Sequence, residues 1–250
     1  MNGHGSLDTL LWGILPYVVL VLLIGGLIWR HRYDKFGWTT RSSELYESRL
    51  LRIGSPLFHF GLLVVIVGHV VGLLVPEGWT DALGVSSTVY HVSALSLGLV
   101  AGFCTLVGIA LLVWRRRTSG PVFSVTTRND KLMYLVLVLA ILTGLGMTVY
   151  FAGTEITGGH TQDYRKTVSP WFRSIWILRP DVAAMASADG LYKLHTLMGL
   201  ALFALFPFTR LVHAFSAPVG YLFRPYIIYR TRDPHHAAAG QAERATRRGW

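Results

Sequence analysis

The chain has 250 residues, of which 52% are apolar and only 14% are charged. Soluble domains carry about 25% charged residues, so this composition argues against a soluble globular protein. The formal net charge of +10 suggests nucleic-acid binding, but the basic residues cluster at the ends of apolar segments, which argues against that function.

Four long stretches of the sequence contain no Asp, Glu, Lys or Arg. Crossing the hydrocarbon core takes about 20 apolar residues, and each stretch reaches that length: residues 9–29, 53–76, 82–114 and 132–154. A fifth span is predicted over residues 191–215, although only 16 uncharged residues separate Lys193 from Arg210, because Arg210 can extend its charged end to the membrane surface. We therefore predict an all-α integral membrane five-helix bundle, with spans near residues 9–29, 53–76, 89–114, 132–152 and 191–215.

The basic residues predict the orientation of these spans. Six Lys or Arg lie in residues 30–52, five in 115–131 and seven from residue 210 onward, eighteen in all. The other side carries only five, within residues 153–193. Basic residues concentrate in cytoplasmic loops. We expect the N-terminus outside, the C-terminus inside, one membrane domain over residues 1–229, and a disordered cytoplasmic tail over 230–250.

Four of the ten histidines fall within two of the predicted spans. They are His59 and His69 in the second span, and His195 and His213 in the fifth. An ionisable side chain inside a membrane is costly and indicates a functional site. Two such residues on each of two helices exceed what ordinary contacts between membrane helices need.

The spacing of these histidines predicts two facing pairs. His195 and His213 are 18 residues apart, which on one helix is five turns, one face and about 27 Å. His59 and His69 are ten residues apart, about 15 Å. Because the second and fifth spans are antiparallel, His59 faces His213 near the inner surface, and His69 faces His195 near the outer surface. The two separations do not match, and a kink at Pro207 closes part of the difference.

Two imidazoles on neighbouring helices are suitable axial ligands for haem iron, and helix bundles commonly hold such cofactors. The sequence therefore predicts two b-type haems, each bound by two histidines. A zinc or di-iron site is disfavoured because no Asp or Glu lies in a predicted span. Cys104 is the only cysteine, which excludes a c-type haem. A haem-free transporter with a histidine proton relay is less favoured, because such relays usually include acidic residues.

Three segments carry a resemblance to a known family. They are SPLFHFGLLVVIVGHVVGLLVP at 55–76, LHTLMGLALFALFPFTRLVHAFSAPVGYL at 194–222, and YDKFGWTTRSSEL at 33–45. In the order, spacing and flanking residues of the four histidines, the chain resembles the gamma subunit of respiratory nitrate reductases. The resemblance covers most of the chain and is weaker in the outer loop and in the last twenty residues.

The resemblance implies a cytochrome b subunit in the cell membrane of a prokaryote, in contact with lipid and quinol or menaquinol. It implies quinol oxidation near the outer haem, between His69 and His195, and an inner haem between His59 and His213. Electrons would pass to a cytoplasmic iron–sulfur subunit, with nitrate reduced on a molybdenum subunit. The alternative function is that of a dihaem membrane anchor in a sulfur-cycle or heterodisulfide-type reductase, because ligand histidines do not identify the terminal electron acceptor.

Some family members carry a lysine, implicated in quinol binding, at the outer end of the third span, and this chain has none there. The nearest polar groups are Tyr90 and His91. His91 can accept a quinol proton at neutral pH, or it is an interfacial side chain without a role. Gly68, next to His69, leaves room for a flat quinol ring, or it serves helix packing.

Two further predictions concern the inner side. Arg210 lies three residues before His213 and can reach either a haem propionate or a lipid phosphate. Residues 216–226 carry apolar side chains that predict a docking surface for the iron–sulfur subunit.

Overall fold

The computed structural model describes residues 5–34, 37–38, 46–159 and 161–216, and the regular structure in these ranges is entirely helical. Five of the helical stretches are long and apolar enough to cross a membrane: Ser6–Tyr33, Arg49–Leu74, Ser87–Thr118, Arg128–Ile156 and Gly190–Phe208. The prediction of an all-α chain with five candidate spans is confirmed. The predicted tail and nearly all of the predicted docking segment 216–226 lie outside the described residues.

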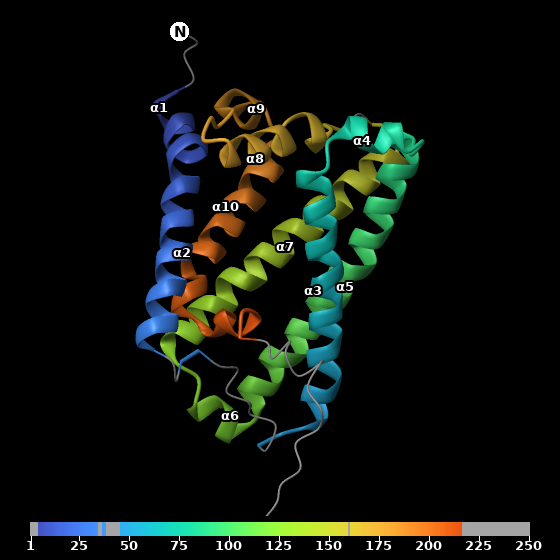
Figure 1. Ribbon diagram of the computed structural model, residues 1–250. Helices are drawn as coiled ribbons and strands as arrows, with labels where there is room; N and C mark the ends of the chain where they lie inside the picture. The colour runs from blue at the N-terminus through green and yellow to red at the C-terminus, as the bar shows by residue number, and fades with distance from the viewer. Residues whose placement is uncertain (1–4, 35–36, 39–45, 160, 217–250) are drawn as a thin grey trace, which may run out of the picture. The chain divides into compact units, whose positions relative to one another are not determined.

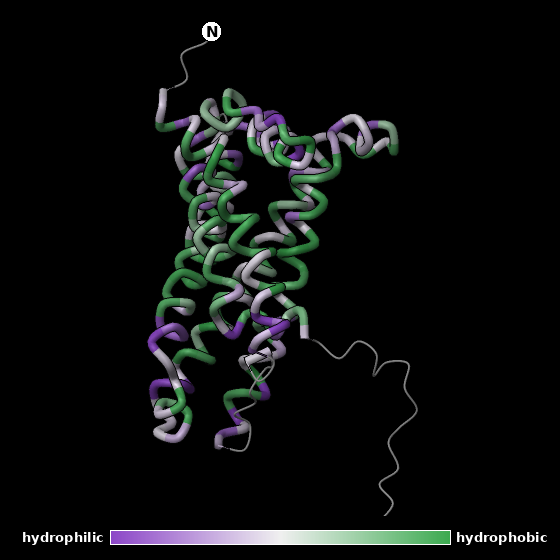
Figure 2. The backbone as a smooth tube through the Cα atoms, turned by 60° about the vertical axis from the view of Figure 1, so that its left-hand side comes forward, coloured by the Kyte–Doolittle hydropathy of each residue, from purple (hydrophilic) through white to green (hydrophobic). Residues whose placement is uncertain are grey.

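The long helices run side by side as one bundle (Figure 1). The first span joins α1 (Ser6–Asp8), a π-helical stretch (Thr9–Ile14) and α2 (Leu15–Tyr33). The other spans are α3 (Arg49–Leu74), α5 (Ser87–Thr118), α7 (Arg128–Ile156) and α10 (Gly190–Leu205). Figure 2 shows hydrophobic residues along the middle of the bundle and hydrophilic residues gathered toward its ends.

The two ends of the bundle differ in structure. At one end, here called the loop end, lie the short helices α4 (Glu77–Ala82), α8 (Val168–Trp176) and α9 (Val182–Ala186) (Figure 1). The opposite end, here called the basic end, holds α6 (Gly120–Ser124) and the last turns of α2 and α5, with Arg30, Arg32 and Arg115–Arg117. That the basic end faces the cytoplasm stays a prediction.

The segment before α10 forms a packed cap over the loop end. Trp171 of α8 is buried against Trp12, Phe151 and Tyr192, which come from the first, fourth and fifth spans. Its indole Nε1–H donates to the backbone carbonyl of Trp12 at 2.8 Å. A buried indole N–H requires such an acceptor. The hydrogen bond therefore ties the cap to the first span, and the hydrophobic cluster packs the cap on the fourth and fifth spans as well.

α3 and α5 approach each other so closely that their backbones touch. A Cβ atom at Gly108 of α5 would lie 2.4 Å from the backbone nitrogen of Phe58 in α3. One at Gly61 would lie 2.9 Å from the carbonyl oxygen of Ala101. Small residues allow membrane helices this approach. Since Phe58 precedes His59, the contact also sets the position of that histidine relative to α5.

The fifth span differs from the expected continuous helix over 191–215. α10 ends at Leu205 and is followed by two 3-10 turns, Phe206–Phe208 and Arg210–Ala214. Thr209 between them is extended, with φ −120° and ψ −178°. Pro207 has no N–H to continue the helical hydrogen bonds. The expectation that His195 and His213 share one face of a five-turn helix is therefore wrong. The separation of about 27 Å assumed a continuous helix, so it does not apply to this pair of residues.

Gly108→Ala should lower the free energy of unfolding by about 1–3 kcal/mol, because the added methyl group must push α3 away from α5. Gly146→Ala in α7 is the matched control, since a Cβ atom there has nothing within 4 Å. It should change the free energy by less than about 0.5 kcal/mol. Denaturation of both variants with SDS in mixed micelles makes the comparison. Equal stability of the two variants would contradict the close packing of α3 on α5.

Candidate functional site

The four membrane histidines form two facing pairs inside the bundle. The ring centres of His59 in α3 and His213 are 6.0 Å apart, and those of His69 in α3 and His195 in α10 are 5.9 Å apart. A metal ion held about 2 Å from a nitrogen of each of two facing imidazoles spaces the ring centres roughly 6 Å apart. Both separations fit two nitrogen ligands on opposite sides of one metal ion.

Backbone carbonyls orient three of these imidazole rings. In each, Nδ1 lies within hydrogen-bond distance of a carbonyl oxygen: 2.7 Å for His59 to Ser55, 2.8 Å for His69 to Val65, and 2.6 Å for His213 to Arg210. A carbonyl only accepts, so Nδ1 carries the proton and the lone pair of the ring lies on Nε2. This arrangement is typical of metal-binding histidines.

His195 is oriented by a neighbouring helix instead. Its Nδ1 lies 3.1 Å from the hydroxyl oxygen of Thr143 in α7. That hydroxyl has the carbonyls of Leu139 at 2.8 Å and Ala140 at 3.1 Å as acceptors, so its oxygen accepts the proton of His195. A Cβ atom at Gly144 would lie 2.7 Å from Cε1 of the ring. Gly144 therefore leaves the room that the imidazole occupies.

The donor set of each pair suits haem iron. Four ligands of that iron come from the porphyrin ring, so the protein needs to supply only two axial nitrogens. In the described part of the chain, no hydrogen bond engages Nε2 of His59, His69, His195 or His213. The same residues contain no group of three or more His, Cys, Asp or Glu placed to hold a metal ion. Two histidines without further protein ligands fit a haem better than a zinc or di-iron centre.

His91 faces a carboxylate at the loop end. Its Nε2 lies 3.6 Å from Oδ1 of Asp163, and its Nδ1 lies 2.8 Å from the backbone carbonyl of Ser87. The two side chains are 28% and 19% exposed, so solvent reaches both. The two groups form an ion pair when the imidazole carries a proton. Sequence reasoning missed Asp163, because the long segment between α7 and α10 gave no sign of where it folds back.

Tyr90 is part of a polar network next to His91. Its hydroxyl lies 2.9 Å from the hydroxyl of Tyr164, and the guanidinium of Arg165 lies 4.0 Å from the centre of its ring. Arg165 also donates to the hydroxyl of Thr80 at 3.0 Å. Burial raises the pKa of Tyr164 far above its ordinary value, so Tyr164 stays neutral. The structure thus places Tyr90 in a network that joins α4 and α5 to the cap.

Gly68 lies on an open face of α3. A Cβ atom there would have nothing within 4 Å, whereas one at Gly72 would lie 2.8 Å from the hydroxyl of Tyr164. Helix packing therefore explains Gly72 and does not explain Gly68. The structure does not bring Gly68 into contact with Tyr90 or His91, since both lie beyond that 4 Å limit.

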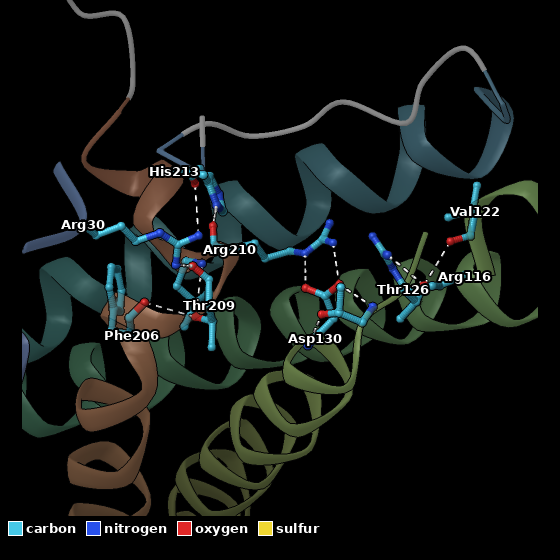
Figure 3. A network of polar contacts seen from close by, with 12 residues as sticks. Arg30, Arg116, Val122, Thr126, Asp130, Phe206, Thr209, Arg210 and His213 are labelled. Atoms are coloured by element: carbon cyan, nitrogen blue, oxygen red, sulfur yellow. Dashed lines mark hydrogen bonds and ion pairs between the residues drawn. The ribbon is translucent and has the colours of Figure 1, made fainter. Parts of the chain in front are cut away.

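Arg210 pairs with a carboxylate that the sequence analysis did not consider. Its Nε and Nη2 lie 2.7 and 2.8 Å from the two oxygens of Asp130, at the start of α7 (Figure 3). Asp130 lies two residues before the predicted fourth span and so escaped the search for acidic residues within spans. The signal that could have found it is the Thr127 to Asp130 spacing, which is typical of a helix start. Contact of Arg210 with a propionate or a lipid phosphate stays a prediction.

The fold defines a multi-pass membrane protein with two facing pairs of histidines, and comparison with known proteins identifies its family. The sequence model of the nitrate reductase gamma subunit family matches residues 8–232. The chain therefore belongs to that family, which confirms the resemblance seen in the sequence. It is a multi-pass protein of the prokaryotic cell membrane.

Individual relatives agree with this assignment. The nitrate reductase gamma chain of Bacillus subtilis is 45% identical over 224 residues, 90% of this chain and 98% of that one. The respiratory nitrate reductase 2 gamma chain of Escherichia coli is 34% identical over 227 residues, with the same coverage. The nitrate reductase-like protein NarX of Mycobacterium tuberculosis is 60% identical over 244 residues. This alignment covers 98% of the present chain and 36% of NarX, so the chain spans about a third of that relative.

Proposed function

We propose that this chain is the membrane cytochrome b subunit of a quinol:nitrate oxidoreductase. One b-type haem would be bound between His59 and His213, and a second between His69 and His195. The observation that carries the proposal is the separation of the facing rings, 6.0 and 5.9 Å, with Nδ1 of every ring engaged elsewhere. Membership of the nitrate reductase gamma subunit family supports it, since that family binds haem.

The two pairs lie at different depths in the bundle. His69 is five residues from the end of α3 at Leu74, next to the loop end, whereas His59 is ten residues from its start at Arg49 and lies nearer the basic end. When bound, the haems supply one-electron transfer between these two ends. The excess of basic residues supports a cytoplasmic basic end. The partners proposed there are an iron–sulfur subunit and a molybdenum subunit that reduces nitrate.

Quinol oxidation is proposed at the loop end, where the chain offers a proton acceptor. Each quinol that becomes a quinone releases two electrons and two protons. Nε2 of His91 would accept one proton from a quinol hydroxyl, beside the carboxylate of Asp163, and pass it to water. The same imidazole would then accept the second proton and release it to water in turn. Proton release outside together with electron movement inward charges the membrane, at about 2.3 kcal/mol per charge per 100 mV.

Two alternative functions have less support. The named relatives favour nitrate over a sulfur compound as the terminal acceptor. A histidine proton relay without haem does not account for four histidines in two separate facing pairs, because a relay needs a continuous series of proton acceptors.

The four single His→Ala variants test the haem pairs. His59→Ala and His213→Ala should remove the same spectral component and halve the haem content, because each removes one of two axial ligands. His69→Ala and His195→Ala should remove the other component. Pyridine haemochrome assays and redox-resolved spectra of the purified protein measure both. His31→Ala is the control, since His31 lies at the end of α2 and packs on Trp38. Loss of one shared component in His59→Ala and His195→Ala would show that the pairing is wrong.

Thr143→Val should weaken haem binding at the His69 and His195 pair by about tenfold to a hundredfold, because Nδ1 of His195 loses the side-chain hydrogen bond that orients its ring. Thr148→Val is the matched control on the same helix, since that hydroxyl donates to the carbonyl of Gly144, within α7. Transfer of haem to apomyoglobin measures retention in both variants. If both retained haem equally, the Thr143 hydroxyl would have no role in orienting His195.

His91→Ala should slow haem reduction by a soluble menaquinol analogue about a hundredfold, the lower range for loss of a proton acceptor. Both haem spectra should stay unchanged. Asp163→Asn should slow reduction less, because the imidazole remains but loses its stabilising charge. Glu77→Gln is the control, a carboxylate at the start of α4. Stopped-flow spectroscopy gives the rates, and an unchanged rate in His91→Ala would assign the proton to another acceptor.

A further inference from the structure

The turn that carries His213 is separated from the helix before it. α10 ends at Leu205, and the extended Thr209 interrupts the hydrogen bonds that would join the 3-10 turn Arg210–Ala214 to that helix. Its other side continues into residue 217, outside the described residues. The 6.0 Å spacing between His213 and His59 therefore needs contacts from other helices to maintain it.

One such contact is the ion pair between Asp130 and Arg210. The two hydrogen bonds of 2.7 and 2.8 Å form the parallel, charge-assisted geometry that arginine makes with a carboxylate. The Asp130 side chain is 7% exposed and that of Arg210 is 24% exposed, so the pair is largely shielded from water. Shielding strengthens the attraction.

Asp130 is itself fixed at the first turn of α7. One of its oxygens accepts from the backbone N–H of Thr127 at 2.9 Å, and its own N–H donates to the Thr127 hydroxyl at 3.1 Å. This reciprocal arrangement is a capping box. The carboxylate is thus held rigidly while it binds Arg210.

Arg210 transmits this constraint to the imidazole of His213. Its side chain makes the ion pair, and its backbone carbonyl accepts from Nδ1 of His213 at 2.6 Å (Figure 3). The direction of the His213 ring therefore depends on where Asp130 holds Arg210.

α2 holds the same turn from another side. Nη1 of Arg30 donates to the carbonyls of Pro207 at 2.7 Å and Thr209 at 2.8 Å, two groups that the end of α10 leaves without helical partners (Figure 3). A Cβ atom at Gly26 would lie 2.7 Å from Cβ of Pro207, so only a glycine allows this approach.

We infer that Asp130, acting through Arg210, and Arg30 are positioning residues that hold His213 opposite His59. They replace the helical hydrogen bonds that end at Leu205. The inference rests on the proposed function, in which this pair binds the haem nearer the partner subunits.

Asp130→Asn tests the inference in the full chain in membranes. An Asn oxygen still caps Thr127, but the charge and the two-oxygen contact with Arg210 are lost. Haem retention at the His59 and His213 pair should fall about tenfold, while the other pair keeps its haem. The low-spin ferric signal of the affected haem in electron paramagnetic resonance should also shift, because that signal depends on the angle between the two imidazole planes.

Thr127→Val is the matched control, since it removes the hydroxyl that accepts from the Asp130 N–H but keeps the Thr127 N–H that holds the Asp130 carboxylate. It should keep both retention and signal. Arg30→Gln should act like Asp130→Asn. If Asp130→Asn does not accumulate in the membrane, Arg210→Lys replaces it, because lysine keeps the charge without the two-nitrogen contact.

A second measurement does not depend on haem. In a Cys104→Ser background, His59→Cys and His213→Cys together should be joined by a short bismaleimide, and Asp130→Asn should reduce that cross-link severalfold. Unchanged cross-linking would overturn the inference. If the unsubstituted protein contained no haem, the proposed function would be contradicted. The inference would still be tested, because the cross-link reports the position of residue 213 without haem. If Asp130→Asn and Arg30→Gln both kept two haems with unaltered retention and unaltered signals, the inference would be overturned. The proposed function would not be affected by that result.

Discussion

A histidine ring inside a membrane must satisfy its N–H group within the protein, and this requirement governs the central region of the molecule. The partners are backbone carbonyls for His59, His69 and His213, and the hydroxyl of Thr143 for His195. Every one of these bonds uses Nδ1 and leaves Nε2 for another ligand. The tautomer of each ring is therefore set by hydrogen bonds within and between neighbouring helices.

The remaining architecture keeps these rings in register. Glycines at the contact of α3 with α5 bring the helix backbones together beside His59, and Gly144 makes room for the ring of His195. At the loop end, Trp171 ties the cap to the first span, while at the basic end Arg30 and Arg210 hold the interrupted fifth span. Membrane helices gain little from hydrophobic attraction to one another. Close contacts and buried hydrogen bonds therefore carry most of the specificity.

Charged groups at the basic end have a different role from the one that composition suggests. A count of Lys and Arg treats Arg30 and Arg210 as residues that orient the chain in the membrane. In the folded chain, Arg30 binds two backbone carbonyls and Arg210 binds Asp130. At the loop end, the carboxylate of Asp163 likewise lies next to the imidazole of His91, a contact that the sequence did not predict. The residues in contact are 177 and 179 positions apart in the sequence for Arg30, 80 for Arg210 and 72 for His91. Patterns among neighbouring residues therefore cannot predict these contacts.

The length of the uncharged apolar segments was enough to predict the number of spans. The positions of four histidines within two of those spans were enough to predict which histidines face each other. Both properties are local in the sequence, because a span must be about 20 residues of low polarity and an ionisable residue stands out within it. Where the fifth helix ends was decided by the tertiary structure, since Pro207 alone permits either a kink or a termination. Arg30 stabilises the termination by binding the carbonyls of Pro207 and Thr209. The partners of His195, His91 and Arg210 were also decided there, because each lies on an element that only folding brings close.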